Sequence, residues 1–203
     1  MTAPAAALAD TVVVVSGLPR SGTSLLMAML QAGGVPLLTD GQRAPDTDNP
    51  RGYFEFEAVK ALRTDAAWPA EARGKAVKIV APLVFQLPPA LACRILFLER
   101  DLDEVVASQT AMLARKGITS PLSPSALKAA LARQVAQARV VLTDTAQRRV
   151  CFVEHRRLIQ SPRAAARSIA DFLGGGLNVA AMAAVVEPGL YRQRHTQAAL
   201  PFS

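Results

Sequence analysis

The chain has 203 residues, 51% of them hydrophobic, and a formal net charge of +7. This length suits one domain with its own core, so we expect a single domain over residues 1–203. The longest apolar runs are far shorter than the roughly 20 residues of a membrane span, and the segment before the first cation, Arg20, lacks the basic n-region of a secretory signal. We therefore expect a cytoplasmic protein that does not cross a membrane.

The basic charge would suit a nucleic-acid partner if it formed a stripe interleaved with aromatic residues. The arginines are instead scattered over several segments, so we expect no nucleic acid and a cleft that attracts a small polyanion. Cys93 and Cys151 are too few for a disulfide framework or a metal knuckle, and we expect buried, reduced thiols.

The N-terminal third begins with a β-branched run at 12–16 that predicts a buried parallel strand. Good helix formers at 24–31, followed by two glycines, predict a helix directly after it. Residues 35–38 are expected to form a second, short strand. The stretch 39–52 is rich in Asp, Pro and Gly and predicts a long surface loop.

The remaining elements alternate between helices and buried strands. Expected helices lie at 54–63, 102–115, 123–146 and 161–173, and expected strands at 76–80, 94–99 and 150–154. Ser-Pro pairs stand at the start of the last two expected helices. Serine is favoured as the N-cap and proline at the first helical position, so each pair indicates a helix start. The alternation predicts an α/β fold, a P-loop nucleotide-kinase-like three-layer sandwich whose mostly parallel central sheet has four or five strands.

A phosphate-binding loop is expected between the first strand and the first helix, which is the context such a loop requires. Its candidate binding residues are Gly17, Pro19, Arg20, Ser21, Gly22, Thr23 and Ser24. Thr23 stands where a nucleoside-triphosphatase loop has its lysine, and the cation of this loop is Arg20. Without that lysine the usual grip on β- and γ-phosphates is missing, which disfavours ATP hydrolysis and ordinary kinase chemistry.

The segment 19–24 resembles the 5'-phosphosulfate loop of the sulfotransferases that use 3'-phosphoadenosine 5'-phosphosulfate. Its arginine form is closer to the tyrosylprotein-type and bacterial members than to the cytosolic phenol-type enzymes. Arg100, after the strand at 94–99, and Ser108 resemble the 3'-phosphate site of the same family. An arginine fork with a hydroxyl suits a phosphate monoester. The resemblance extends from residue 12 to about residue 174.

The resemblance implies a role for each matching residue. Arg20 would neutralise charge around the transferred group, and the hydroxyls of Thr23 and Ser24 would donate to the 5'-phosphate. Lys78 resembles the family lysine that stabilises the leaving group. Arg192 resembles part of a basic C-terminal segment that covers the 3'-phosphate.

The general base is left open by the sequence. Val80 stands where phenol-type enzymes carry their histidine, and we expect His155 and His195 to be polar surface groups. Asp40 is the favoured base because it falls within one residue of the catalytic glutamate of the tyrosylprotein-type enzymes. Glu55 is the runner-up.

The function expected from these features is sulfonate transfer to a hydroxyl or amine on a small-molecule or peptide acceptor, with no metal required. The alternatives are a catalytically silent phosphoadenosine-nucleotide-binding module, an atypical P-loop kinase and a basic nucleic-acid binder. The loop at 39–52 and the Trp68-Pro69 region are expected to face the acceptor. The sequence identifies neither the acceptor nor the oligomeric state.

Overall fold

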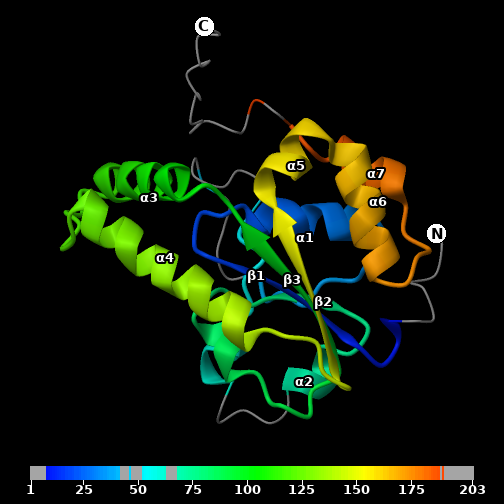
Figure 1. Ribbon diagram of the computed structural model, residues 1–203. Coiled ribbons are helices and arrows are strands. Elements are labelled where there is room, and N and C mark those ends of the chain that lie inside the picture. Colours follow the sequence, from blue (N-terminus) through cyan, green and yellow to red (C-terminus); the bar gives the residue numbers. More distant parts are fainter. Residues whose placement is uncertain (1–7, 42–45, 47–51, 63–67, 188, 190–203) are drawn as a thin grey trace, which may run out of the picture.

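A computed structural model describes residues 8–41, 46, 52–62, 68–187 and 189. Its core is a parallel sheet with helices on both faces (Figure 1). The strands are β1 (Val12–Gly17), β2 (Ala76–Lys78), β3 (Cys93–Glu99) and β4 (Arg148–Glu154), in the spatial order β2-β1-β3-β4. This arrangement confirms the expected α/β fold with a mostly parallel sheet of four or five strands.

The two faces of the sheet are covered by different helices, which Figure 1 shows. The valines of β1 alternate between them, since successive side chains of a strand point to opposite faces. Val12 and Val14 belong to the core under α3 (Leu102–Arg115) and α4 (Pro124–Val141). The other two valines pack with α1 (Thr23–Ala32) and α6 (Pro162–Phe172). All four are fully buried, and each contributes about 1.5–3 kcal/mol of hydrophobic stabilisation.

Helices α3 and α4 begin at residues whose side chains cap them, whereas the expected cap Ser161 makes no side-chain hydrogen bond to the first turn of α6. The Asp101 carboxylate accepts hydrogen bonds from the backbone N–H groups of Asp103 and Glu104, at 2.9 and 3.1 Å, and opens α3. The Ser123 hydroxyl accepts from the Ala126 N–H at 3.3 Å and opens α4. The short helices are α2 (Trp68–Glu71), α5 (His155–Gln160), α7 (Val179–Ala184) and the 3-10 turns η2 (Glu57–Ala61) and η3 (Leu83–Gln86).

Three predicted elements are shorter than expected. Residues 35–38 form no strand beyond a single parallel bridge between Leu37 and Ala76, because Pro36 has no N–H for a ladder. Of the predicted helix at 54–63, residues 54–62 are described and only the η2 turn among them is helical. Phe54 has a left-handed φ of 51°, and Phe56 is extended. Helix α4 ends at Val141, where the side chains of Asp144 and Thr145 bind the backbone of the turn into β4 instead.

Further expectations concern single residues and the membrane. Cys93 is buried and Cys151 partly buried, and both are free thiols.

Trp68 is 1% exposed and part of the core, so the expectation that it faces an acceptor is wrong. Within the described ranges, no helix is both long and apolar enough to cross a bilayer.

Candidate nucleotide-binding site

The phosphate loop joins the carboxyl end of β1 to the first turn of α1. Arg20 has a left-handed φ of 73°, a conformation that costs a non-glycine residue about 1–3 kcal/mol and is concentrated at functional sites. Gly22, at φ 101°, is the N-cap of α1, and the first turn of this helix contains no acidic residue. The N–H groups of a first helical turn have no intrahelical partner. The loop therefore offers a site for an anion.

Two residues of the loop must be glycine for steric reasons. A Cβ on Gly17 would lie 2.6 Å from the Leu98 carbonyl oxygen and 2.6 Å from the Ser21 hydroxyl. A Cβ on Gly22 would lie 2.5 Å from Cδ2 of His155. The loop is thus packed directly against the end of β3 and the start of α5.

Arg20, Arg100 and Ser108 come together at the carboxyl ends of β1 and β3, although they belong to motifs far apart in the sequence. Arg20 donates from Nε to the Ser108 hydroxyl at 3.0 Å. Arg100 donates from Nη1 to the Arg20 carbonyl oxygen at 3.1 Å. The Gln109 side chain adds a hydrogen bond of 3.1 Å to the carbonyl oxygen of Pro19. The second motif therefore holds the loop from the side of α3.

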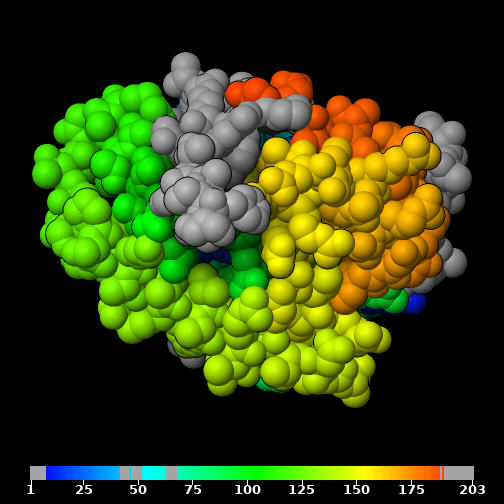
Figure 2. Space-filling view, turned by 45° about the horizontal axis from the view of Figure 1, so that its top comes forward, coloured from blue at the N-terminus to red at the C-terminus, as the bar shows by residue number. Residues whose placement is uncertain are grey.

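Arg100 is itself fixed by a buried ion pair. Its Nε lies 2.9 Å from Oε2 of Glu104, in the first turn of α3, and the two side chains are only 10% and 6% exposed. Ser108 is buried as well, although a serine of that helix would ordinarily lie on the surface. Figure 2 shows α3 and α4 (green) on one side of the molecule and α5 (yellow) on the other.

Lys78 is the last residue of β2 and is buried. It donates to the Tyr53 carbonyl oxygen, and its Nζ lies 3.6 Å from Oε1 of Glu55. The Tyr53 hydroxyl in turn donates to both carboxylate oxygens of Asp46, at 2.8 and 2.7 Å. Glu55 thus stands beside the lysine at the end of the sheet, with its side chain 36% exposed.

Asp40 is engaged with the backbone of the same segment. Its Oδ2 accepts from the Glu57 N–H at 2.6 Å, and its own N–H donates to the Glu55 carbonyl oxygen at 3.1 Å. The Thr39 hydroxyl donates to that same carbonyl at 2.9 Å. The Asp40 carboxylate therefore holds the start of η2 in place, and with it the backbone of Glu55.

The sequence predicts a surface position for His155, and this prediction is wrong. His155 is 5% exposed rather than a surface group, because the chain turns directly from β4 into α5 beneath the phosphate loop. Burial removes water from the imidazolium and Arg100 repels it, so that the pKa of His155 falls to about 4, although Glu104 acts in the opposite direction. A sequence signal existed, since His155 directly follows a predicted buried strand, as Arg100 does.

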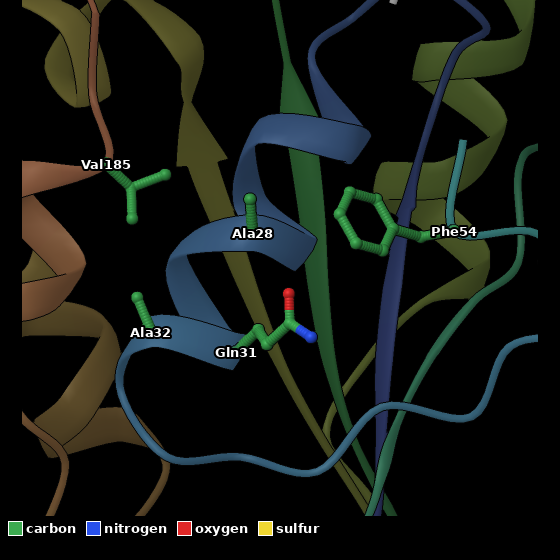
Figure 3. A pocket seen from close by; sticks show the side chains of 5 residues that line it. All are labelled: Ala28, Gln31, Ala32, Phe54 and Val185. Carbon is green, nitrogen blue, oxygen red and sulfur yellow. The ribbon is translucent and has the colours of Figure 1, made fainter. Parts of the chain in front are cut away.

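An apolar groove of about 420 Å³ lies beside the second half of α1, and Figure 3 shows the residues that line it. They are Ala28, Gln31, Ala32, Phe54 and Val185. Phe54 is the neighbour of Glu55, so the groove begins close to the Lys78 side of the site. Arg192 and His195 lie outside the described residues.

Comparison with known proteins gives matches by structure alone. No family model matches the sequence, and no curated protein does either. Among solved structures, the sulfotransferase domain from the curacin biosynthetic pathway matches with a TM-score of 0.54 at 14% identity, over 96% of this chain and 93% of that one. The sulfotransferase domain of the Synechococcus PCC 7002 olefin synthase gives 0.54 at 16% identity, over 98% and 92%.

A third match is the mouse sulfotransferase SULT7A1 in complex with PAP, with a TM-score of 0.54 at 17% identity over 87% of this chain and 62% of that one. At these identities the likeness concerns the fold. The overall fold of this chain is thus similar to that of these three sulfotransferase structures.

Proposed function

We propose that this chain is a sulfotransferase that binds 3'-phosphoadenosine 5'-phosphosulfate in the crevice at the carboxyl ends of β1 and β3. The observation that carries the proposal is the contact of Arg20 with Ser108 and of Arg100 with the Arg20 carbonyl. It joins the two motifs that would bind the two ends of one bisphosphorylated nucleotide. Ligands of parallel α/β sheets bind at this edge of the sheet.

The residues present fit such a nucleotide. The start of α1, with Thr23 and Ser24 and no carboxylate in its first turn, suits the 5'-phosphosulfate. Arg20, Arg100 and Ser108 supply two guanidinium groups and a hydroxyl for the 3'-phosphate end. In this arrangement the Arg20 side chain is assigned to the 3'-phosphate, beside Ser108, and not to the transferred group. Its backbone still belongs to the phosphate loop.

The chemistry expected of the residues on the Lys78 side is proton transfer and charge stabilisation. An acceptor oxygen or nitrogen bonds to the sulfonate sulfur, the bond from sulfur to the 5'-phosphate oxygen breaks, and the acceptor's proton passes to a carboxylate. We assign that carboxylate to Glu55, which stands 3.6 Å from Lys78 and is partly exposed to an incoming acceptor. Lys78 then stabilises the negative charge left on the phosphate.

Asp40, the carboxylate that the sequence favoured, is assigned a supporting role. Its Oδ2 already accepts a 2.6 Å hydrogen bond from the Glu57 N–H, which fixes the segment that carries Glu55. Val80 has no group that accepts a proton. The acceptor is proposed to be a hydroxyl or amine on a small molecule or a peptide, and the protein to act in the cytoplasm without nucleic acid.

A catalytically silent nucleotide-binding module is the second candidate. It is favoured by the Lys78 ammonium, which is buried and hydrogen bonded to the Tyr53 carbonyl. Such a protein would bind the bisphosphate nucleotide and transfer nothing.

The experiment that tests the proposal is a calorimetric titration with 3'-phosphoadenosine 5'-phosphate, and with ATP plus magnesium. We expect binding of the bisphosphate and much weaker binding of ATP. The reverse preference would favour the kinase alternative. An acceptor screen with the sulfonate donor then separates the enzyme from the silent module, because the module would bind the donor and leave it intact.

A further inference from the structure

We propose that His155 is a positioning residue of the nucleotide site, whose ring holds Gly22 of the phosphate loop and Arg100, which follows β3, in one fixed arrangement. The inference rests on the proposed function, since the loop and Arg100 are taken as the two ends of the nucleotide site. His155 lies outside both motifs in the sequence, and only the fold brings it to the site.

The sheet register places His155 between the two halves of the nucleotide site. Glu99, the last residue of β3, pairs with Glu154, the last residue of β4, so Arg100 and His155 directly follow the ends of two adjacent parallel strands. Side chains at that position emerge at the same edge of the sheet. His155 therefore begins α5 beside Arg100 and under the loop that follows β1.

Packing supplies the contact with the loop. The space that a Gly22 side chain would need is filled by the His155 ring, whose Cδ2 and Nε2 would lie 2.5 and 3.0 Å from a Cβ there. Gly22 has a φ of 101° and is the N-cap of α1. The ring thus packs directly against the backbone from which the anion-binding N–H groups of the helix start.

The chemistry of an imidazole suits this place better than other polar side chains. The charged groups near it are Arg100 and Glu104, which form their own ion pair. A lysine or arginine here would repel Arg100, and a carboxylate would compete with a phosphate for its guanidinium. A neutral ring supports Arg100 and the loop without adding charge, and the lowered pKa of His155 keeps it neutral at pH 7.

The test is a double-mutant cycle of Gly22→Ala and His155→Ala, with the affinity for 3'-phosphoadenosine 5'-phosphate measured by calorimetry. In the wild-type background the new methyl group meets the His155 ring, whereas in the His155→Ala background the ring is gone. We expect Gly22→Ala to weaken binding about tenfold more in the first background than in the second, which is a typical coupling for residues in contact. Equal losses in both backgrounds would overturn the proposal.

His155→Phe is the matched control, because it keeps a ring against Gly22 and cannot titrate. We expect its affinity to stay within about threefold of wild type, while His155→Ala loses about tenfold or more and keeps its circular dichroism spectrum. If His155→Phe binds as weakly as His155→Ala, packing of the ring is not the cause and the proposal is wrong.

A measurement on the wild-type protein covers the case in which His155→Ala does not fold. The chain has two histidines, so the imidazole signals of His155 are assigned by their loss in His155→Phe. We expect them to be those of a neutral ring at pH 7 and to shift on saturation with the bisphosphate, and an unmoved signal would contradict the proposal. If the wild-type protein binds no bisphosphate, both this proposal and the proposed function are wrong. If the wild-type protein binds it normally but the effects of Gly22→Ala and His155→Ala are additive, only the role of His155 is wrong.

Discussion

The phosphate-loop side of the site and the Lys78 side are held by different kinds of contact. On the first side, Arg20 lies in the loop after β1, Arg100 directly follows β3, and Ser108 lies in the helix after β3. Their hydrogen bonds connect segments that lie close to the ends of these two neighbouring strands. On the second side, Glu55 belongs to a long connection after α1, and hydrogen bonds from Thr39 and Asp40 fix its backbone. Nucleotide binding should therefore depend on the first side and turnover on the second.

The largest expected effect is on the Lys78 side. Glu55→Gln should reduce turnover by about 10² to 10⁴, because the amide cannot accept the acceptor's proton. The affinity for 3'-phosphoadenosine 5'-phosphate should stay near that of wild type. Both quantities are measured on the same preparation, by a turnover assay with an acceptor found by screening and by calorimetry.

The matched control for Glu55→Gln is Asp40→Asn. Its amide oxygen can still accept from the Glu57 N–H, so the segment should stay in place and turnover should fall little. If Asp40→Asn abolishes turnover while Glu55→Gln keeps it, Asp40 is the base and our assignment is reversed.

The next effect concerns pH and the phosphate-loop side. The folded protein keeps His155 neutral with a pKa of about 4, below its ordinary value of 6.5, so the unfolded chain binds the proton more readily. The free energy of unfolding should therefore fall as the pH drops below 6.5 and level off near pH 4. The total loss should be about 3 kcal/mol, since each pKa unit of difference between the folded and unfolded states corresponds to about 1.36 kcal/mol. Denaturant unfolding of wild type and His155→Phe over this range measures it, and equal slopes for the two proteins would show that His155 does not titrate in this way.

Loss of a loop group should weaken nucleotide binding to a similar or smaller degree. Arg20→Ala and Thr23→Ala should each cost about 1.5–3 kcal/mol, the range for hydrogen bonds to charged groups. Turnover at saturating donor should change less than the affinity. The affinity of both variants for 3'-phosphoadenosine 5'-phosphate is measured by calorimetry. Unchanged affinity in both would show that the loop does not bind the nucleotide.

The smallest expected effect distinguishes the two ends of the nucleotide. Ser108→Ala should lower affinity for the bisphosphate by about 1 kcal/mol and leave adenosine 5'-phosphate nearly unaffected, because only the former has a 3'-phosphate. Arg100→Ala is expected to weaken both ligands, since Arg100 also holds the Arg20 carbonyl. Equal losses for both ligands in Ser108→Ala would contradict its assignment to the 3'-phosphate.

The same contrast explains what could be predicted from the sequence. Strand β1, the loop after it and the Arg100 motif are local patterns, in which a buried run, a glycine turn and a capping aspartate lie within a few residues of one another. The sheet then brings their ends together, as parallel strands require. The sequence was therefore sufficient to place Arg20, Arg100 and Ser108 at one edge.

The parts that sequence reasoning placed wrongly depend on contacts between distant segments. His155 looked like a surface residue because its ring is packed against Gly22, which lies far away in the sequence in the loop after β1. The expected helix at 54–63 failed at Phe54, whose left-handed backbone no periodicity indicates. The sequence ranked Asp40 above Glu55 as the base, whereas the contacts that lead us to the opposite assignment, the Glu57 N–H on Asp40 and Lys78 beside Glu55, are visible only in the fold.

The short strand β2, which carries Lys78, has a consequence for local opening. It forms three residue pairs with β1, whereas β3 and β4 share seven. Among the described strands β2 also lies at an end of the sheet, joined on its outer side by the bridge to Leu37. Segments with few pairs open at lower free energy than the global unfolding transition. The amide hydrogens of β2 should thus exchange with solvent well before those of β3. The ion pair between Lys78 and Glu55 should then open and close while β1 and β3, at the nucleotide-binding end of the sheet, stay folded.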